Sequence, residues 1–198
     1  MATKVEICNL ALLNIGVKPI TAITEASEAA RRLTIIYVPS RDEVLRGHDW
    51  KFATRIEALT ELADQEVLGW DYVYQVPTNC LFMRHVYDES TQAEKDEQDF
   101  QEVYLPAPVN AKVIASNLED AYGEYTYKIT DESLFDASFV NAFSHYLAAQ
   151  LAIPLTGDKA LAEQQERKYR LAIGQARSTN RAEGKETIER TSSYEDAR

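Results

Sequence analysis

Cys80 and His85 come nearest to a catalytic pair, because a histidine can act as the base that activates a cysteine thiol. Both lie in a run of β-branched and aromatic residues that predicts a strand, where residues five apart point to opposite faces. The pair is therefore poorly placed for nucleophilic catalysis. The sequence also contains no Walker, Cys-x-x-Cys, His-Glu-x-x-His or Gly-x-Ser-x-Gly pattern. We therefore expect no catalytic residue, no metal site and no cofactor.

Carboxylates are the second group with possible chemistry. Residues 54–136 contain 18 acidic and 5 basic side chains, a net charge of −13, whereas the rest of the chain has 14 acidic and 16 basic ones, a net charge of +2. The densest run includes Glu94, Asp96, Glu97, Asp99 and Glu102. It lacks the Asp-x-Asp-x-Asp-Gly pattern of a calcium loop. It fits a solvated loop, or a surface that repels DNA phosphates so that DNA slides past.

The overall composition excludes several classes of protein. The net charge of −11 argues against a protein that wraps nucleic acid by neutralising phosphates. No apolar run reaches 18 residues, so we expect no membrane span. Glu6 interrupts any apolar stretch near the N-terminus, which argues against a signal peptide. Cys8 and Cys80 are far apart in sequence and are expected to be free thiols.

Helical patterns occupy the two ends of the chain. A capping box at Thr3 and Glu6 predicts a helix over residues 4–15, followed by Gly16. A second helix starts near Thr24 or Ser27, breaks or kinks at Pro39 and ends at Gly47. Two more helices follow Asp131, one ending at Ile153-Pro154 and one beginning at Thr156.

Alternating β-branched and aromatic residues predict strands between the two helical regions. The predicted strands cover residues 56–60, 70–76, 80–87, 102–105, 112–115 and 124–129. The fold class that follows is α+β: a four-helix bundle with two N-terminal and two C-terminal helices, an inserted antiparallel β-rich module and an extended C-terminal tail. The predicted domains are residues 1–53 with 131–177 for the bundle, 54–130 for the acidic insert and 178–198 for the tail. Trp50 and Phe52 are expected where bundle and insert join.

Several short stretches carry a resemblance to a known family. They are Ile7–Gly16 with Pro19 after it, Ser27–Tyr37, Arg41–Arg46, Trp50 with Phe52-Ala53, and Tyr74–Pro77 with Asn79–Leu81. Through them the chain resembles the head-to-tail adaptors of tailed bacteriophages, similar to tail tubular protein A and the portal adaptors of short-tailed phages. The resemblance covers residues 5–86. Pro39 and the long acidic insert depart from the family pattern.

The resemblance implies a structural virion protein of the tail or neck, assembled in the host cytoplasm. Such adaptors form a closed ring of about twelve copies under the portal. They extend the DNA channel, which DNA crosses without sequence-specific binding, and carry the next nozzle or fibre protein. For the polar tail we expect docking on the portal through Arg181, Lys185, Ile188, Arg190 and Tyr194, or packing on a ring neighbour. The acidic residues between Glu94 and Glu102 would then face the channel or the tail-side partner.

Two functions of other classes stay open at this point. One is a cell-wall hydrolase carried in the tail, which would use a carboxylate pair across a cleft. With 32 acidic residues, some pair will meet that separation by chance, so the sequence does not test it. The other is a binding module that acts as a monomer.

Overall fold

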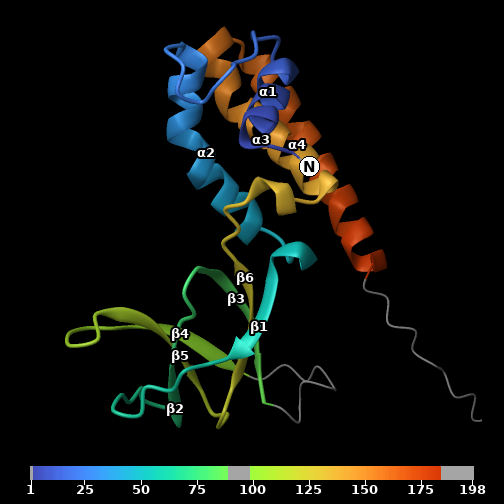
Figure 1. The fold of residues 1–198 in the computed structure, drawn as a ribbon. Helices are drawn as coiled ribbons and strands as arrows, with labels where there is room; N and C mark the ends of the chain where they lie inside the picture. The colour runs from blue at the N-terminus through green and yellow to red at the C-terminus, as the bar shows by residue number, and fades with distance from the viewer. Residues whose placement is uncertain (1, 89–98, 184–198) are drawn as a thin grey trace, which may run out of the picture.

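A computed structural model describes residues 2–88 and 99–183 of the chain, and it has an α+β fold. Helices lie at both ends of the described chain: α1 (Lys4–Asn14), α2 (Glu28–Arg46), α3 (Ala137–Thr156) and α4 (Lys159–Glu183), with short 3₁₀ turns η1 (Lys51–Ala53) and η2 (Glu132–Leu134). The strands between them are β1 (Thr54–Ala58), β2 (Tyr72–Gln75), β3 (Cys80–Tyr87), β4 (Phe100–Leu105), β5 (Ala111–Ser116) and β6 (Tyr122–Tyr127). Figure 1 shows the helices gathered at one end of the molecule and the strands at the other.

The predicted bundle of two N-terminal and two C-terminal helices is wrong. The C-terminal helices α3 and α4 form the main helical pair, and α1 and α2 each pack on α3. The physical reason is the composition of α3, which buries Phe139, Phe143, Leu147 and Leu151 among others and so offers apolar surface to several partners at once. A helix of that kind becomes the centre of the helical part. The apolar patterns predict where the helices are, but they do not predict which helices pack against each other.

The predicted helix ends are partly confirmed. Thr3 and Glu6 form the capping box, with the Thr3 amide donating to a Glu6 carboxylate oxygen at 2.7 Å. Gly16 follows α1 with a φ of 70°, which a glycine adopts without strain. Of the two effects predicted for Pro39, the break is wrong, because α2 runs through it, and the end predicted at Pro154 is wrong as well, because α3 continues to Thr156. Both prolines are exposed, so water can satisfy the carbonyl oxygen that each proline leaves without its helical donor.

The strands of the described residues are antiparallel, as predicted, and they form two three-stranded sheets. Their strand orders are β1-β6-β3 and β2-β5-β4. The two sheets share a small core that includes Tyr74, Met83, Val86, Ile114 and Tyr125. At Gly123 of β6 the Leu59 side chain packs so close to the backbone that an added Cβ would lie 2.8 Å from Leu59 Cδ2. The β part therefore has its own apolar core, separate from that of the helices.

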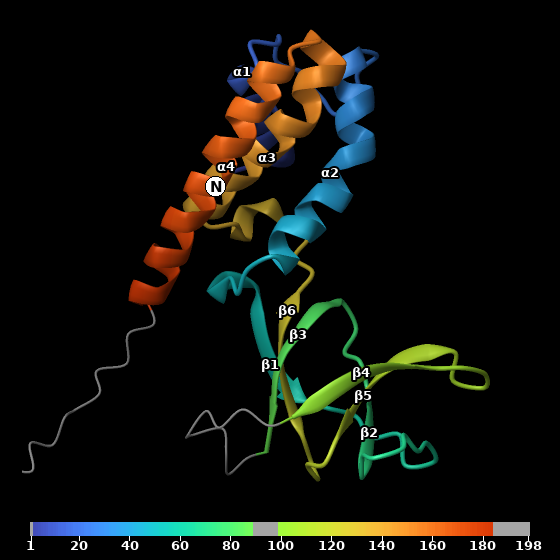
Figure 2. The ribbon, with the colours of Figure 1, turned by 180° about the vertical axis from the view of Figure 1, so that it is seen from behind.

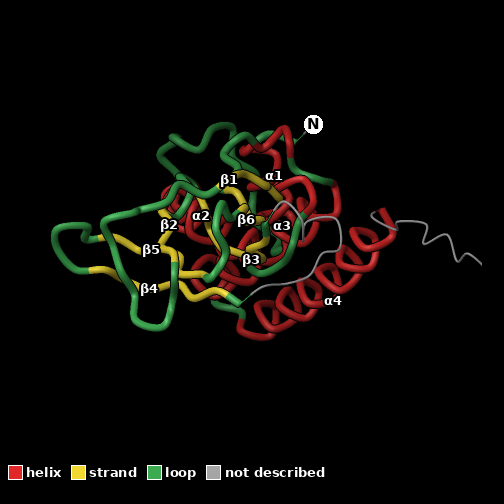
Figure 3. The backbone as a smooth tube through the Cα atoms, turned by 90° about the horizontal axis from the view of Figure 1, so that it is seen from below, coloured by secondary structure: helices red, strands yellow, loops and turns green. Residues whose placement is uncertain are grey.

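Two elements project from the body on opposite sides. In Figures 1 and 3 the hairpin of β4 and β5 reaches out on one side and the C-terminal half of α4 on the other. Tyr104 near the hairpin tip is 60% exposed, and Leu171 on α4 is 69% exposed. Large apolar side chains in such positions are available to partners.

Candidate functional site

Trp50 anchors the junction between the helical and β parts. Its side chain is buried and its Nε1 donates to the carbonyl oxygen of Val44 at 3.1 Å. Its ring packs edge-on against Phe139 of α3, with centroids 5.1 Å apart. Phe52 lies next to it and packs against Phe139 at 5.3 Å. The two aromatic residues singled out in the sequence thus lie at the base of the helical core, at the point where the chain enters β1.

Polar contacts fix the two parts to each other. Arg84 of β3 donates to the carbonyl oxygen of Arg46 at the end of α2, at 2.8 Å, and to the hydroxyl of Thr126 at 3.0 Å. Burial is the main cause that lowers the pKa of Arg84. Lys128, just after β6, reaches Asp42 of α2 at 2.8 Å, and Asp42 also pairs with the buried Arg41 at 2.7 Å. These contacts tie α2 to the β1-β6-β3 sheet, which α2 meets end-on in Figure 2.

The predicted portal-binding residues lie at or beyond the end of α4. Arg181 belongs to that helix, which continues to Glu183, so the segment assigned to the tail starts as helix. Lys185, Ile188, Arg190 and Tyr194 lie outside the described residues. Their role stays a prediction.

The predicted acidic surface is described only in part. Glu94, Asp96 and Glu97 lie outside the described residues. Asp99 is exposed just before β4, and Glu102 on β4 forms an ion pair with Lys112 of the neighbouring strand β5. One of the predicted negative charges is therefore balanced within the hairpin. The pair also satisfies the cross-strand preference for opposite charges.

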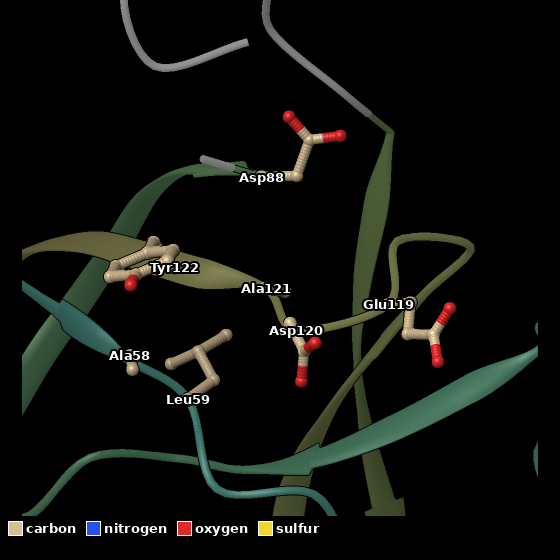
Figure 4. Close-up of a pocket in the computed structure, with 7 residues that line it drawn as sticks. All are labelled: Ala58, Leu59, Asp88, Glu119, Asp120, Ala121 and Tyr122. Atoms are coloured by element: carbon tan, nitrogen blue, oxygen red, sulfur yellow. The ribbon is translucent and has the colours of Figure 1, made fainter. Parts of the chain in front are cut away.

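A second group of carboxylates surrounds a hollow of about 470 Å³ at one end of the β part. Asp88, Glu119 and Asp120 line it together with Leu59 and Tyr122. In Figure 4 the three carboxylates point in different directions and do not converge on one position. Glu119 and Asp120 are exposed, and Asp120 sits at a turn with a φ of 52°. This arrangement offers a negative surface rather than a pair of carboxylates aimed at one bond.

Neither thiol is set up as a nucleophile. Burial raises the pKa of Cys8 to about 12 and that of Cys80 to about 11, so both are protonated near neutral pH. Within the described ranges, no group of three or more His, Cys, Asp or Glu side chains could hold a metal ion. These side chains and the exposed backbone of β1 are available for binding.

Two surfaces were missed by the sequence interpretation. An apolar hollow of about 600 Å³ lies along the outer side of α1, lined by Leu10, Leu13, Val17 and Pro19 among others. Its signal in the sequence is that α1 has apolar residues around its whole circumference, mixed with Glu6 and Asn9, so some of them stay uncovered when one side packs on α3. The other surface is the free edge of β1, whose residues Arg55 to Ala58 are all exposed.

Comparison of the sequence with models of protein families and with curated proteins finds no significant match to either. The family suggested by the short stretches of sequence therefore stays a prediction. Among the helices of the described residues, none is long and apolar enough to cross a membrane.

Proposed function

We propose that the chain is a structural head-to-tail adaptor of a bacteriophage, which attaches to the portal and carries the next protein of the tail. The observation that carries the proposal is the division of the molecule into two parts of different charge. A helical part with a large core belongs to the near-neutral sequence, and a β part with a small core belongs to the segment with a net charge of −13. Such a body can present different surfaces to different neighbours.

The projecting elements support separate contacts on separate sides. In this proposal the C-terminal end of α4 and the residues after it contact the portal, while the β part faces the DNA channel or the downstream nozzle or fibre protein. The negative β part would keep DNA phosphates from adhering within about one Debye length, ~8 Å at physiological salt. In a ring, the helical parts of adjacent copies would contact one another through unlike surfaces.

A cell-wall hydrolase is supported less well. Hydrolysis of a glycosidic bond needs one carboxyl group held protonated by an apolar environment and a second one across the bond. Asp88, Glu119 and Asp120 point apart in Figure 4, and the last two are exposed to water. Their surroundings provide neither the convergence nor the apolar burial that such an acid requires.

The proposal is tested by mixing the purified chain with the portal ring of its own phage and imaging the mixture. We expect a second ring of density under the portal, containing several copies of the chain. Electron microscopy without such density, at concentrations well above those of assembly, would contradict the adaptor function.

Two truncations locate the contact. Removing residues 184–198 leaves all of α4, whereas removing residues 178–198 also shortens the helix. If the segment after α4 carries the contact, both truncations abolish attachment equally. If the shorter truncation still attaches and the longer one does not, the end of α4 is the contact. Unchanged attachment of both would overturn the assignment of portal binding to this end of the chain.

A further inference from the structure

The edge strands of the two sheets are protected to different degrees. β2 has its outer edge covered, since the Gln75 amide donates to the Thr60 carbonyl oxygen and the Leu62 amide donates to that of Val73, both at 2.8 Å. β3 contains two register irregularities and packs against α2. Bulges and covering elements are the usual means of blocking an edge. β1 has no bulge, because its five pairs with β6 run in unbroken register, and among the described residues no strand pairs with its outer edge.

The exposure of β1 is unusual for a strand in a packed sheet. Arg55 to Ala58 are exposed on both faces, and Ile56 is 49% exposed. In Figures 1 and 2 no described strand lies on its outer side. Hollows open beside both of its ends, one lined by Thr54 and Arg55 and another by Glu57 and Ala58. An exposed, regular edge of this kind is a template for another strand.

The hydrogen-bond register determines which groups face outward. The Leu59 amide donates to the Ala121 carbonyl oxygen at 2.8 Å, in line with the register of β1 on β6. In an antiparallel ladder the direction of the backbone groups alternates along the strand. Arg55 and Glu57 therefore bond to β6, and Ile56 and Ala58 direct their N–H and C=O groups to the free edge. The Thr54 carbonyl oxygen also faces outward.

The side chains of β1 are complementary to themselves. In an antiparallel pair of two β1 strands centred on Ile56, Ile56 lies opposite Ile56, and Arg55 of each strand lies opposite Glu57 of the other. The central pair is the hydrogen-bonded kind, because the Ile56 backbone groups face outward. The Arg55–Glu57 pairs are then of the non-hydrogen-bonded kind, in which the side chains lie closest. Both charges would be matched, and the exposed isoleucine would be partly covered.

We propose that β1 is a homodimer interface, in which the β1 strands of two copies pair antiparallel about Ile56 and join their sheets β1-β6-β3 into one. The ladder would contain four backbone hydrogen bonds by the alternation just described, between the two Ile56 residues and between each Ala58 amide and the opposite Thr54 carbonyl oxygen. The pairing concerns the free chain and does not depend on the adaptor function.

Charge reversal gives a direct test. Arg55→Glu places two glutamates on β1, and Glu57→Arg places two arginines there, so each variant opposes like charges in its own dimer. In a mixture of the two variants, every pair across the interface is again of opposite charge. We expect each variant alone to dimerise about tenfold or more weakly than the unchanged chain, and the mixture to recover the dimer. The double variant Arg55→Glu, Glu57→Arg should recover it as well.

Sedimentation equilibrium over a wide range of protein concentration measures the association. Circular dichroism checks folding, since Arg55 also lies over the Tyr127 ring at 3.4 Å and Glu57 accepts a hydrogen bond from the Tyr125 hydroxyl at 2.9 Å. Glu61→Arg, an equal charge change beyond the end of β1, is the control and should leave the dissociation constant within about twofold of the unchanged chain. Ile56→Pro removes an outward N–H group and should weaken the dimer without breaking the bonds to β6.

Each other outcome overturns the proposal. A chain that stays monomeric at the highest concentration has no such interface, and the charges of β1 then serve to keep the edge unpaired. A dimer that forms equally well with Arg55→Glu or Glu57→Arg uses a different surface. A mixture of the two folded variants that recovers no association shows that Arg55 and Glu57 do not face each other across an interface.

Discussion

The helical part and the β part bury their side chains very differently. The helical core is continuous from α1 through α3 and includes Trp50 and four phenylalanine or tyrosine side chains, Tyr37, Phe135, Phe139 and Phe143. The β core is much smaller, and strands such as β1 are exposed on both faces. Since burial of apolar area is the main source of stability, the helical part should be the stable base and the β part the dependent one.

The largest expected effect comes from the junction. Trp50→Ala removes a buried ring and leaves the Val44 carbonyl oxygen without its donor, so we expect a loss of about 3 to 5 kcal/mol in the free energy of unfolding. Trp70→Ala is the matched control in the β part, where the ring is half-buried and its Nε1 lies 3.3 Å from Gln101 Oε1. That change should cost about 1 kcal/mol or less. Urea unfolding followed by circular dichroism measures both, and equal losses would remove the distinction between the two regions.

Alkaline pH should weaken the helical part. Burial raises the pKa of the Cys8 thiol to about 12, so the folded chain keeps a proton that the unfolded chain loses above its ordinary pKa near 9. The stabilisation is complete below pH ~9 and is lost as the pH rises towards 12. When the pH is raised from ~8 to ~10.5, the free energy of unfolding of Cys8→Ala should fall by about 1 to 2 kcal/mol less than that of the unchanged chain. Cys80→Ala, whose thiol has a pKa raised to about 11, is the comparison in the β part and should show a nearly equal difference, because both folded pKa values lie above this pH range.

The sequence predicts local structure better than assembly. The capping box of Thr3 and Glu6, the glycine after α1 and most strands depend on neighbouring residues, and the structure contains them. The sequence left open whether Pro39 breaks or kinks the helix, because a break depends on whether the Ile35 carbonyl oxygen meets water, and in the structure α2 runs through Pro39. The pairing of helices around α3 depends on the relative size of apolar faces. The sequence could not predict the free edge of β1, because the strand order β1-β6-β3 places β1 at the edge, and that order depends on contacts between segments far apart in the sequence.

Close packing inside the β part gives a smaller effect. In Gly123→Ala the new methyl group would meet Leu59 Cδ2 at 2.8 Å and Met83 Sδ at 3.1 Å. Both neighbours are the ends of flexible side chains, so we expect a loss of only about 1 to 1.5 kcal/mol. The double variant Gly123→Ala, Leu59→Ala should lose less than the sum of the two single variants, because the shortened side chain makes room. If urea unfolding shows that the losses of the two single variants simply add, the contact between the new methyl group and Leu59 does not limit the packing.

The smallest effect is expected at a helix end. The Ser27 hydroxyl accepts a hydrogen bond from the Ala30 amide at 3.2 Å and caps α2. Ser27→Ala should cost about 0.5 to 1 kcal/mol, since a helix amide loses its acceptor. Thr24→Ala, the matched control, removes the hydroxyl of an exposed residue that precedes the helix and should cost less than about 0.3 kcal/mol. Thermal unfolding of the two variants compares them, and a reversed order would contradict the cap at Ser27.

The contrast between a stable helical part and a dependent β part is tested most directly by native-state hydrogen exchange. The α3 amides around Phe143 and Leu147 should exchange most slowly. The free energy of the opening that exposes them should equal the free energy of global unfolding. The outward amides of Ile56 and Ala58 should exchange fastest among the strands, and only they should slow as the protein concentration rises. Protection of β1 equal to that of α3 in dilute protein would contradict the division of the molecule into these two parts.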